Sequence, residues 1–305
     1  MAARAADRTG RSQRVGELLD WATRRLQTAG LHYGHGTAGA RDDAAALVFH
    51  ALGLRHDSAP ASYRRAVPAG GAERVAALIR RRIEDRVPTA YLTGVTWFAG
   101  HEIRVTPAVL VPRSPIAELC QDSFGPWIAA ARVRRVLDIG TGSGCIAIAA
   151  ACALPRARVD ATDISARALA VARANVRRHH LGRRVRLLRS DVYAGLRGRR
   201  YDIIVSNPPY VSAAGMGRLP AEYRSEPRIG LYAADGGLAI IDRILAGARR
   251  HLVPHGILVV EAGDTELAVM QRWPSLPMTW LQFARGGGGV FLLYASQLQE
   301  MRDVR

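Results

Sequence analysis

From residue 133 onward, strand-like and helix-like patterns alternate, and this alternation constrains the fold more than any other feature. Strands are predicted at 135–139, 158–162, 185–189, 201–206 and 256–262. Helical segments are predicted between them, at 144–153, 165–180 and 237–251. Strands that alternate with such helices form a parallel sheet covered on both faces. The stretch 279–294, with four consecutive glycines inside it, predicts a final antiparallel hairpin. We therefore expect an α/β, doubly wound domain.

The first 94 residues follow a different, helical pattern. Apolar residues recur at helical spacing in three segments, 13–30, 40–54 and 71–87. We predict three parts: a helical substrate-recognition domain at 1–94, a hairpin linker at 95–118 and the α/β domain at 119–305. The start of the first part is basic and expected to be loosely ordered, through Arg4, Arg8, Arg11 and Arg14. A second arginine group indicates either a solvated helix face or a partner-binding surface: Arg80, Arg81, Arg82 and Arg86.

The charge balance favours anionic partners. The formal net charge is +17, and all 43 basic residues are arginine. This arginine surface predicts contact with ribosomal RNA or a pre-ribosomal particle, although drift of solvated positions towards arginine is the alternative. The three cysteines have no paired spacing and the histidines form no metal signature, so we predict no metal and a reducing compartment. No secretory signal or membrane-length apolar run is present, which predicts a cytoplasmic protein.

A glycine-rich loop follows the first predicted strand of the α/β domain. Its glycines, Gly140, Gly142 and Gly144, allow the backbone to approach a ligand closely, and a helix begins directly behind them. The dinucleotide pattern G-x-G-x-x-G would place its last glycine at Cys145, so a pyrophosphate ligand is disfavoured.

Carboxylates near the strand ends suggest which ligand the loop holds. Asp163 can accept both hydroxyls of a ribose, and Asp191 can accept an adenine amino proton while Val192 covers the ring. Asp138 favours a ligand with positive charge. Helix capping is the competing role for Asp163. A ribose, an adenine and a cation without phosphate describe S-adenosyl-L-methionine. The residues that the sequence assigns to this donor site are Asp138, Gly140, Thr141, Gly142, Ser143, Gly144, Asp163, Ile164, Asp191 and Val192.

The box Asn207-Pro208-Pro209-Tyr210 directly follows the strand at 201–206. The Asn207 amide and the Pro208 carbonyl can accept the two N–H bonds of a planar amine, and Tyr210 can cover the plane. The two prolines have fixed φ and no N–H, so the loop is stiff and its carbonyls are held in place. Because an amide nitrogen is a poor nucleophile, catalysis by this box would rest mainly on positioning and exclusion of water.

Together with the helical N-terminal part, the loop and the box resemble the HemK/PrmC and PrmB group of glutamine N5-methyltransferases, over nearly the whole chain from residue 13. The resemblance implies S-adenosyl-L-methionine as the methyl donor and a class I methyltransferase fold. It also implies that a glutamine side-chain amide of a translation protein is the acceptor.

The linker separates two branches of that family. Release-factor enzymes carry Leu-(Ile/Val)-Pro-Arg-Pro-(Asp/Glu)-Thr-Glu, whereas this chain has Ser114-Pro115-Ile116 after Pro112 and Arg113. It is similar there to the PrmB branch, as it is in 86–93, 97–102, 219–227 and 279–291. That branch acts on the third protein of the large ribosomal subunit. The resemblance assigns Pro112, Arg113 and the Asn207–Tyr210 box to substrate binding. It also assigns Asn207 to the donor site.

Three alternatives remain at this point. Methylation of a peptide chain release factor is the nearest. Adenine N6-methyltransferases share an amine-gripping box, but flipping a base needs a nucleic-acid recognition domain, and the helical part has no evident aromatic strip. A non-catalytic assembly factor would bind through arginines alone and leave the complete donor and acceptor sets without a role.

Overall fold

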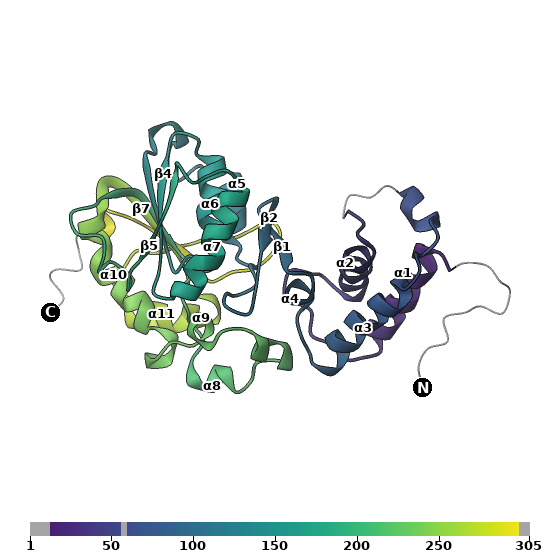
Figure 1. Cartoon of the computed structure of the whole chain (residues 1–305). Helices are drawn as coiled ribbons and strands as arrows, with labels where there is room; N and C mark the ends of the chain where they lie inside the picture. The colour runs from purple at the N-terminus through teal and green to yellow at the C-terminus, as the bar shows by residue number, and fades with distance from the viewer. Residues whose placement is uncertain (1–12, 56–59, 299–305) are drawn as a thin grey trace. The chain divides into compact units, whose positions relative to one another are not determined.

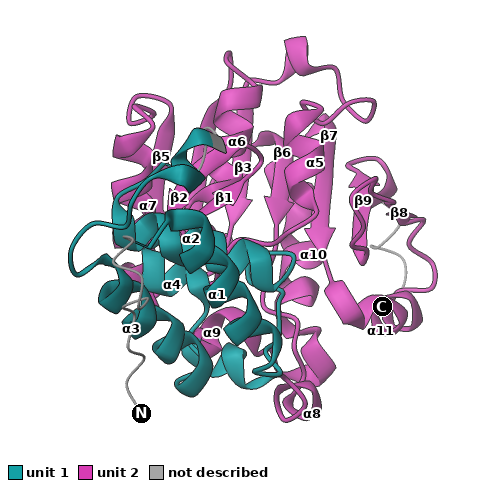
Figure 2. Ribbon diagram, turned by 90° about the vertical axis from the view of Figure 1, so that its right-hand side faces the viewer, with its two compact units in different colours: residues 1–95, 220–225 teal, residues 96–219, 226–305 magenta. Residues whose placement is uncertain are grey.

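The structure is a computed structural model that describes residues 13–55 and 60–298. The chain divides into two compact units (Figure 2). The first comprises Met1–Val95 together with Pro220–Ser225, and the second comprises Thr96–Leu219 and Glu226–Arg305. The basic start predicted at Arg4, Arg8 and Arg11 lies outside the described residues.

The first unit is helical. Its elements are α1 (Val15–Gln27), α2 (Ala40–Leu52), a 3-10 helix (Pro60–Arg64), α3 (Gly71–Glu84) and α4 (Thr89–Thr93). Three helices lie where the apolar spacing predicts them. Buried side chains from α1, α2 and α3 form one core, with Leu19, Leu47 and Ile79 each at most 2% exposed.

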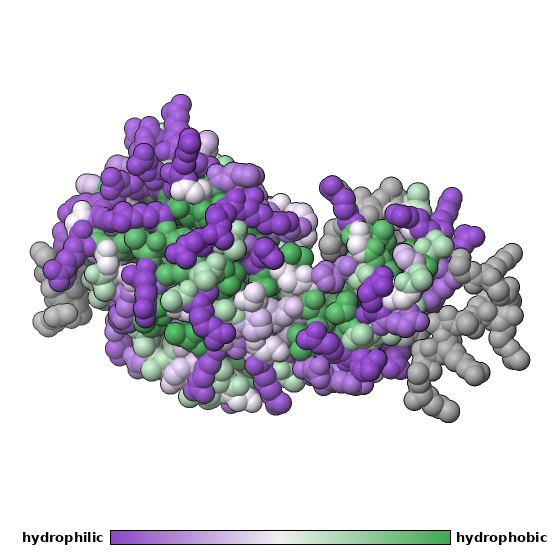
Figure 3. All heavy atoms as spheres, in the orientation of Figure 1, coloured by the Kyte–Doolittle hydropathy of each residue, from purple (hydrophilic) through white to green (hydrophobic). Residues whose placement is uncertain are grey.

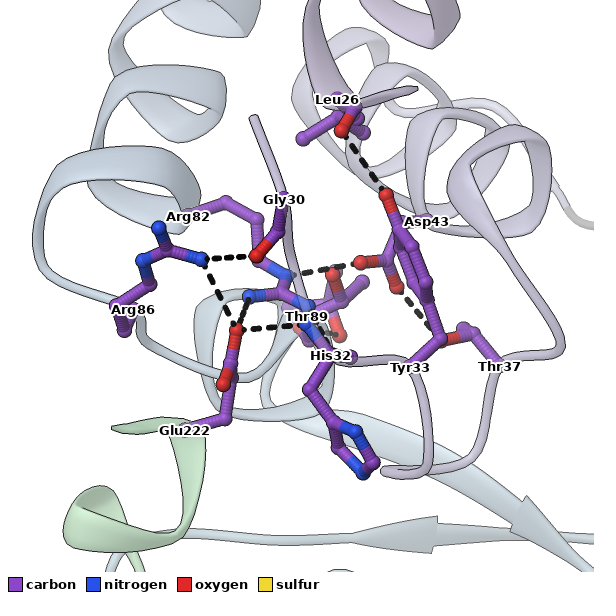
Figure 4. A network of polar contacts seen from close by, with 11 residues as sticks. Leu26, Gly30, His32, Tyr33, Thr37, Asp43, Arg82, Arg86, Thr89 and Glu222 are labelled. Atoms are coloured by element: carbon purple, nitrogen blue, oxygen red, sulfur yellow. Dashed lines mark hydrogen bonds and ion pairs between the residues drawn. The ribbon is translucent and has the colours of Figure 1, made fainter. Parts of the chain in front are cut away.

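A buried ionic network in this unit includes a residue from far along the chain (Figure 4). Arg82 binds Asp43 through Nε at 2.8 Å, Glu222 at 3.3 Å and the His32 carbonyl at 2.8 Å. Arg86 donates to the Gly30 carbonyl and lies 3.6 Å from Glu222. The expectation that the arginines of α3 share a solvated or partner-binding face is therefore wrong for Arg82, which is 2% exposed.

The second unit begins with a small hairpin, β1 (Val95–Phe98) and β2 (His101–Arg104). A short helix, α5 (Ile116–Gln121), and a 3-10 turn at Ala130–Arg132 follow it. The hairpin lies within the segment 95–118, where the sequence predicts a hairpin linker.

A seven-stranded sheet forms the centre of this unit, in the order β5-β4-β3-β6-β7-β9-β8 (Figure 1). Its strands are β3 (Arg135–Ile139), β4 (Arg158–Asp163), β5 (Val185–Arg189), β6 (Tyr201–Ser206), β7 (Leu252–Glu261), β8 (Thr279–Trp280) and β9 (Val290–Tyr294). The first five are mutually parallel, and β9 pairs antiparallel with β7 and β8. The predicted doubly wound sheet with a terminal antiparallel hairpin is confirmed.

Helices cover both faces of the sheet (Figure 1). On one side lie α6 (Cys145–Ala153) and α7 (Ala166–Arg178), which contact β3, β4 and β5. On the other lie α10 (Ala239–His251) and α11 (Glu266–Arg272), whose buried residues share a core with β6, β7 and β9. No helix of the described residues is long and apolar enough to span a membrane.

The segment between β6 and α10 contains short elements that the sequence patterns do not predict. They are α8 (Ala213–Met216), α9 (Arg228–Leu231) and 3-10 turns at Ala221–Ser225 and Asp235–Gly237; a further turn, Gly263–Thr265, follows β7. Because β3, β4, β6 and β7 are parallel, their carboxyl ends meet at one edge of the sheet. The residues singled out in the loop and in the box lie at this edge.

Candidate active site

The glycine loop joins β3 to α6 with three left-handed backbone positions. Gly140, Gly142 and Gly144 have φ values of 71°, 55° and 83°, which disfavour any other residue. Gly144 also lies against α7, where an added Cβ would be 3.3 Å from the Ala172 Cβ. The loop is therefore determined both by its own backbone and by the packing of α6 on α7.

Most of the loop amides are already bonded within the protein. Thr141 N donates to the Thr162 carbonyl at 2.8 Å, and Gly142 N donates to Asp163 Oδ2 at 2.9 Å. Gly144 N donates to the Thr141 carbonyl at 2.8 Å. A phosphate would need such amides directed at it, so the geometry agrees with the sequence argument against a pyrophosphate ligand.

Asp138, beneath the loop, is a fully buried carboxylate. Its Oδ2 accepts hydrogen bonds from Thr141 Oγ1 at 2.5 Å and from Ala147 N at 3.2 Å. Its Oδ1 is buried without a hydrogen-bond partner in the described residues. Burial raises the pKa of Asp138 from 3.8 to about 7, against the lowering effect of those two hydrogen bonds. A buried oxygen of this kind fits a ligand that brings a positive charge or a donor.

Asp163 ends β4, as predicted, and organises two neighbouring turns. Oδ2 accepts from Gly142 N, and Oδ1 accepts from Ser165 N at 2.8 Å. Ser165 in turn caps α7 by accepting from Ala168 N. Burial raises the pKa of Asp163. Next to it, Ile164 leaves 46% of its surface exposed, which gives an apolar surface for a planar ring.

Asp191 follows β5 by two residues and lies at the same edge of the sheet. Its carboxylate pairs with Arg243 at 2.8 Å, and both side chains are 47% exposed. Val192 is 7% exposed and has a φ of 51°, so the backbone turns sharply there. This ion pair involves Arg243, which the sequence patterns do not connect with Asp191.

The predicted acceptor box lies beside the donor loop. Ser206, the last residue of β6, donates through Oγ to the Ile139 carbonyl at 2.8 Å. A Cβ added to Gly140 would come within 4.0 Å of the Asn207 carbonyl oxygen. The structure thus brings the glycine loop and the box together at the ends of two neighbouring strands.

Tyr210 is fixed by two glycines and one carboxylate. Its hydroxyl donates to Glu261 Oε1 at 3.1 Å, and its ring fills the space above Gly263, where an added Cβ would be 2.4 Å away. Its carbonyl oxygen would be 2.1 Å from a Cβ added at Gly237. Burial raises the pKa of Tyr210 far above its usual value. The phenol therefore remains neutral and acts as a hydrogen-bond donor.

Glu261, at the end of β7, connects the box to the linker. It is 5% exposed and accepts from Tyr210, from a short hydrogen bond of Ser114 Oγ and from the Asn207 side chain. Burial raises its pKa, while these donors and Arg113 act in the opposite direction. Its carboxylate is therefore fully used in holding the two polar side chains of the box.

The linker residues predicted to bind substrate have structural partners of their own. Arg113 donates to Glu226 with both terminal nitrogens, at 2.6 and 2.7 Å, and Val111 N donates to the same carboxylate at 2.9 Å. Pro112 is buried. This arrangement holds the linker, and with it Ser114, against the box.

Two acidic residues of the site are absent from the sequence-based assignment. Glu261 directly follows the apolar run 256–260. The position at a strand end that drew attention to Asp163 would therefore also have identified Glu261. Glu226 has no such signal, because its partner Arg113 is 113 residues away in the chain.

Comparisons with known proteins show which families the two parts of the chain resemble. The methyltransferase small domain matches residues 126–218, and the PrmC N-terminal domain matches residues 17–94. Ribosomal protein uL3 glutamine methyltransferase of Xanthomonas campestris is 44% identical over 92% of this chain and 91% of its own. The same enzyme of Xylella fastidiosa is 45% identical over 94% and 92%. A methyltransferase structure from Pyrococcus furiosus has a TM-score of 0.46 at 22% identity, covering 63% of this chain and 88% of its own.

Proposed function

The chain belongs to the family of ribosomal protein uL3 glutamine methyltransferases, and from this we propose that it methylates the side-chain amide nitrogen of a glutamine in uL3, with S-adenosyl-L-methionine as donor. The observation that carries the proposal is the contact of two sites. The Asn207 carbonyl lies next to the glycine loop, so an amide held by the box would face a donor held by the loop.

The box would act by orienting the amide. Asn207 Oδ1 and the Pro208 carbonyl would accept its two N–H bonds, and Tyr210 would cover its plane. An asparagine amide can turn by 180° and present its NH2 group instead of its oxygen. An ionised Glu261 only accepts hydrogen bonds, so it favours the orientation in which Nδ2 points to Glu261 and Oδ1 is free for the substrate.

The residues around the loop fit S-adenosyl-L-methionine, which supplies a methyl group on a positively charged sulfur. Asp138 and Asp163 provide carboxylates for the cation and the ribose, Asp191 and Val192 would hold the adenine, and Ile164 offers an exposed apolar surface. Gly140, Thr141, Gly142, Ser143 and Gly144 would line the donor. The fit rests on the unpartnered Oδ1 of Asp138 and on loop amides that are already bonded internally.

Among the acceptors considered, the glutamine of uL3 is best supported. The relatives named for uL3 match across both units, including the N-terminal helices. We propose that the helical domain and the linker residues Pro112 and Arg113 serve recognition of the protein substrate. This acceptor also implies a cytoplasmic enzyme.

The experiment is methylation with labelled donor and three purified acceptors: uL3, a peptide chain release factor and ribosomal RNA. We expect label on one glutamine of uL3, located by mass spectrometry. Asn207→Ala should lose transfer by orders of magnitude while donor affinity, measured by calorimetry, stays close to normal. Arg173→Gln, an exposed change on α7, serves as the matched control. Label on the release factor or on adenine instead would refute the uL3 assignment.

A further inference from the structure

The five parallel strands all begin in arginine-rich segments. These segments are 132–135, 156–158, 183–186, 197–200 and 249–250, which lead into β3, β4, β5, β6 and β7. Since the strands are parallel, segments far apart in the sequence converge on the amino edge of the sheet, opposite the candidate active site. Hydrophilic side chains gather at this end of the unit in Figure 3. Seven exposed members of these segments, with at least one before each strand, define what we call the arginine edge: Arg134, Arg135, Arg156, Arg158, Arg186, Arg200 and Arg250.

Carboxylates do not neutralise the arginine edge. Two acidic residues lie nearby, but Asp160 is occupied by Arg199 and the Tyr201 hydroxyl, both at 2.8 Å. Asp202 accepts the main-chain amides of Arg134 and Arg135 and contacts His255. Within 13–55 and 60–298, no guanidinium of the arginine edge forms an ion pair.

The sheet register forces like charges together. Arg135 and Arg158 are direct partners on β3 and β4, so their side chains project from the same face of neighbouring strands, about 4.8 Å apart. Like charges at such positions disfavour folding. A bound polyanion would remove this repulsion.

The shape and chemistry of the arginine edge select the polyanion. Five adjacent strands span about 19 Å at about 4.8 Å per interval, enough for several successive phosphates of a nucleic-acid backbone. Guanidinium groups bind phosphate with two parallel hydrogen bonds. A membrane surface fits less well, because the large exposed apolar side chains of the described residues all lie outside the arginine-rich segments: Trp97, Ile164, Ile229, Leu267 and Met270.

We propose that the arginine edge is a docking surface for RNA. The choice of RNA over DNA rests on the proposed function, since a ribosomal protein acceptor is found with ribosomal RNA. RNA bound at the amino edge would leave the carboxyl edge, with its buried carboxylates, open to the protein substrate. The enzyme could then hold the acceptor and its RNA at opposite ends of one sheet.

The test compares two triple variants with the same loss of charge. Arg135→Gln/Arg158→Gln/Arg200→Gln changes the arginine edge, and Arg104→Gln/Arg167→Gln/Arg173→Gln changes exposed arginines elsewhere in the same unit. Binding to a labelled RNA hairpin and to a large-subunit rRNA fragment is measured between 50 and 300 mM salt. We expect at least tenfold weaker binding for the edge variant, with a salt slope smaller by about 2.7, since each phosphate contact contributes about 0.9. The control variant should stay within about twofold of the wild type.

Equal losses in both variants would overturn the proposal, because the charge would then act diffusely. Absence of RNA binding by the wild type would overturn it as well. So would a membrane preference, in which the edge variant loses more binding to phosphatidylserine vesicles than to RNA. Methylation of free uL3 is measured in parallel and should be unchanged in the edge variant. A failure of that methylation in the wild type would count against the proposed function and leave the RNA measurement standing.

Discussion

Replacing Asp138 by asparagine should stabilise the ligand-free protein and weaken donor binding. The carboxyl group is 0% exposed and one of its oxygens has no hydrogen-bond partner in the described residues. Burial raises its pKa from 3.8 to about 7. The native state therefore binds more protons than the unfolded state between these values, and stability falls as the pH rises through this window. Asparagine keeps an oxygen for Thr141 and Ala147 N but carries no charge.

The size of the effect follows from the pKa difference. A rise from 3.8 to about 7 is about 3 pKa units, or about 4 kcal/mol of unfolding free energy at pH 8. A cationic ligand within about 4–6 Å lowers the pKa of a carboxyl group by about 1–3 units. Donor binding to the wild type should then release a proton below pH 7 and tighten by up to about tenfold per pH unit. Asp138→Asn should bind the donor about 10- to 1000-fold more weakly.

Two measurements test this reasoning. Urea unfolding of both proteins at pH 5 and pH 8 should show that the asparagine variant gains stability mainly at pH 8. Calorimetry with S-adenosyl-L-methionine from pH 5.5 to 8.5 should show a pH dependence in the wild type that the variant lacks. The variant also controls for titration of the donor itself. Equal donor affinities at all pH values would refute the assignment of Asp138 to the donor site.

Further variants test the other carboxylate and the packing around it. Glu261→Gln removes one charge-assisted hydrogen bond, worth about 1.5–3 kcal/mol, and should therefore lower kcat about 10- to 100-fold. Donor affinity in calorimetry should be unchanged. An unchanged kcat would exclude a positioning role for Glu261. Gly263→Ala should lower kcat and destabilise the second unit by about 1–3 kcal/mol in urea unfolding, because Gly263 has a φ of 50° and the new methyl group would meet the Tyr210 ring. Gly182→Ala is the control: a Cβ there has open space, and the change should be neutral. Arg82→Ala should destabilise the helical unit by about 3–5 kcal/mol in thermal unfolding, since it leaves the buried Asp43 without a cationic partner. Exposed Arg81→Ala should cost less than about 0.5 kcal/mol, and similar losses in both variants would contradict the buried network.

The central strands were predictable because both of their faces are buried. The runs predicted at 135–139 and 201–206 match β3 and β6 residue for residue. The prediction at 185–189 also matches β5, although β5 is an edge strand with exposed arginines. Strands buried on both faces lack polar alternation and are bounded by turns, so their ends are visible in the sequence. The short elements at 213–216 and 228–231 have no such run. Their conformation depends on tertiary contacts between residues distant in the sequence, such as the bridge of Val211 with Tyr232.

The misassigned arginine of α3 had a signal in the sequence. Val75, Ile79 and Arg82 are spaced as i, i+4 and i+7, which places Arg82 on the buried stripe of the helix. Its neighbours Arg80 and Arg81 point elsewhere because successive helical residues are about 100° apart. The partner Glu222 could not be predicted, since the two residues are 140 positions apart and no pattern connects them.

Asp138 and Glu261 show how burial and hydrogen bonding together separate two roles for carboxylates at strand ends. Both are nearly inaccessible to solvent, and burial raises the pKa of both. Glu261 accepts hydrogen bonds from three side chains, so its charge is stabilised by the protein alone and its function is to orient them. Asp138 keeps one oxygen without a partner, so its charge is incompletely stabilised until something else supplies a donor or a cation. The residue that the folded protein leaves unsatisfied is the one expected to face the ligand, and the satisfied one is expected to position the groups that touch the substrate.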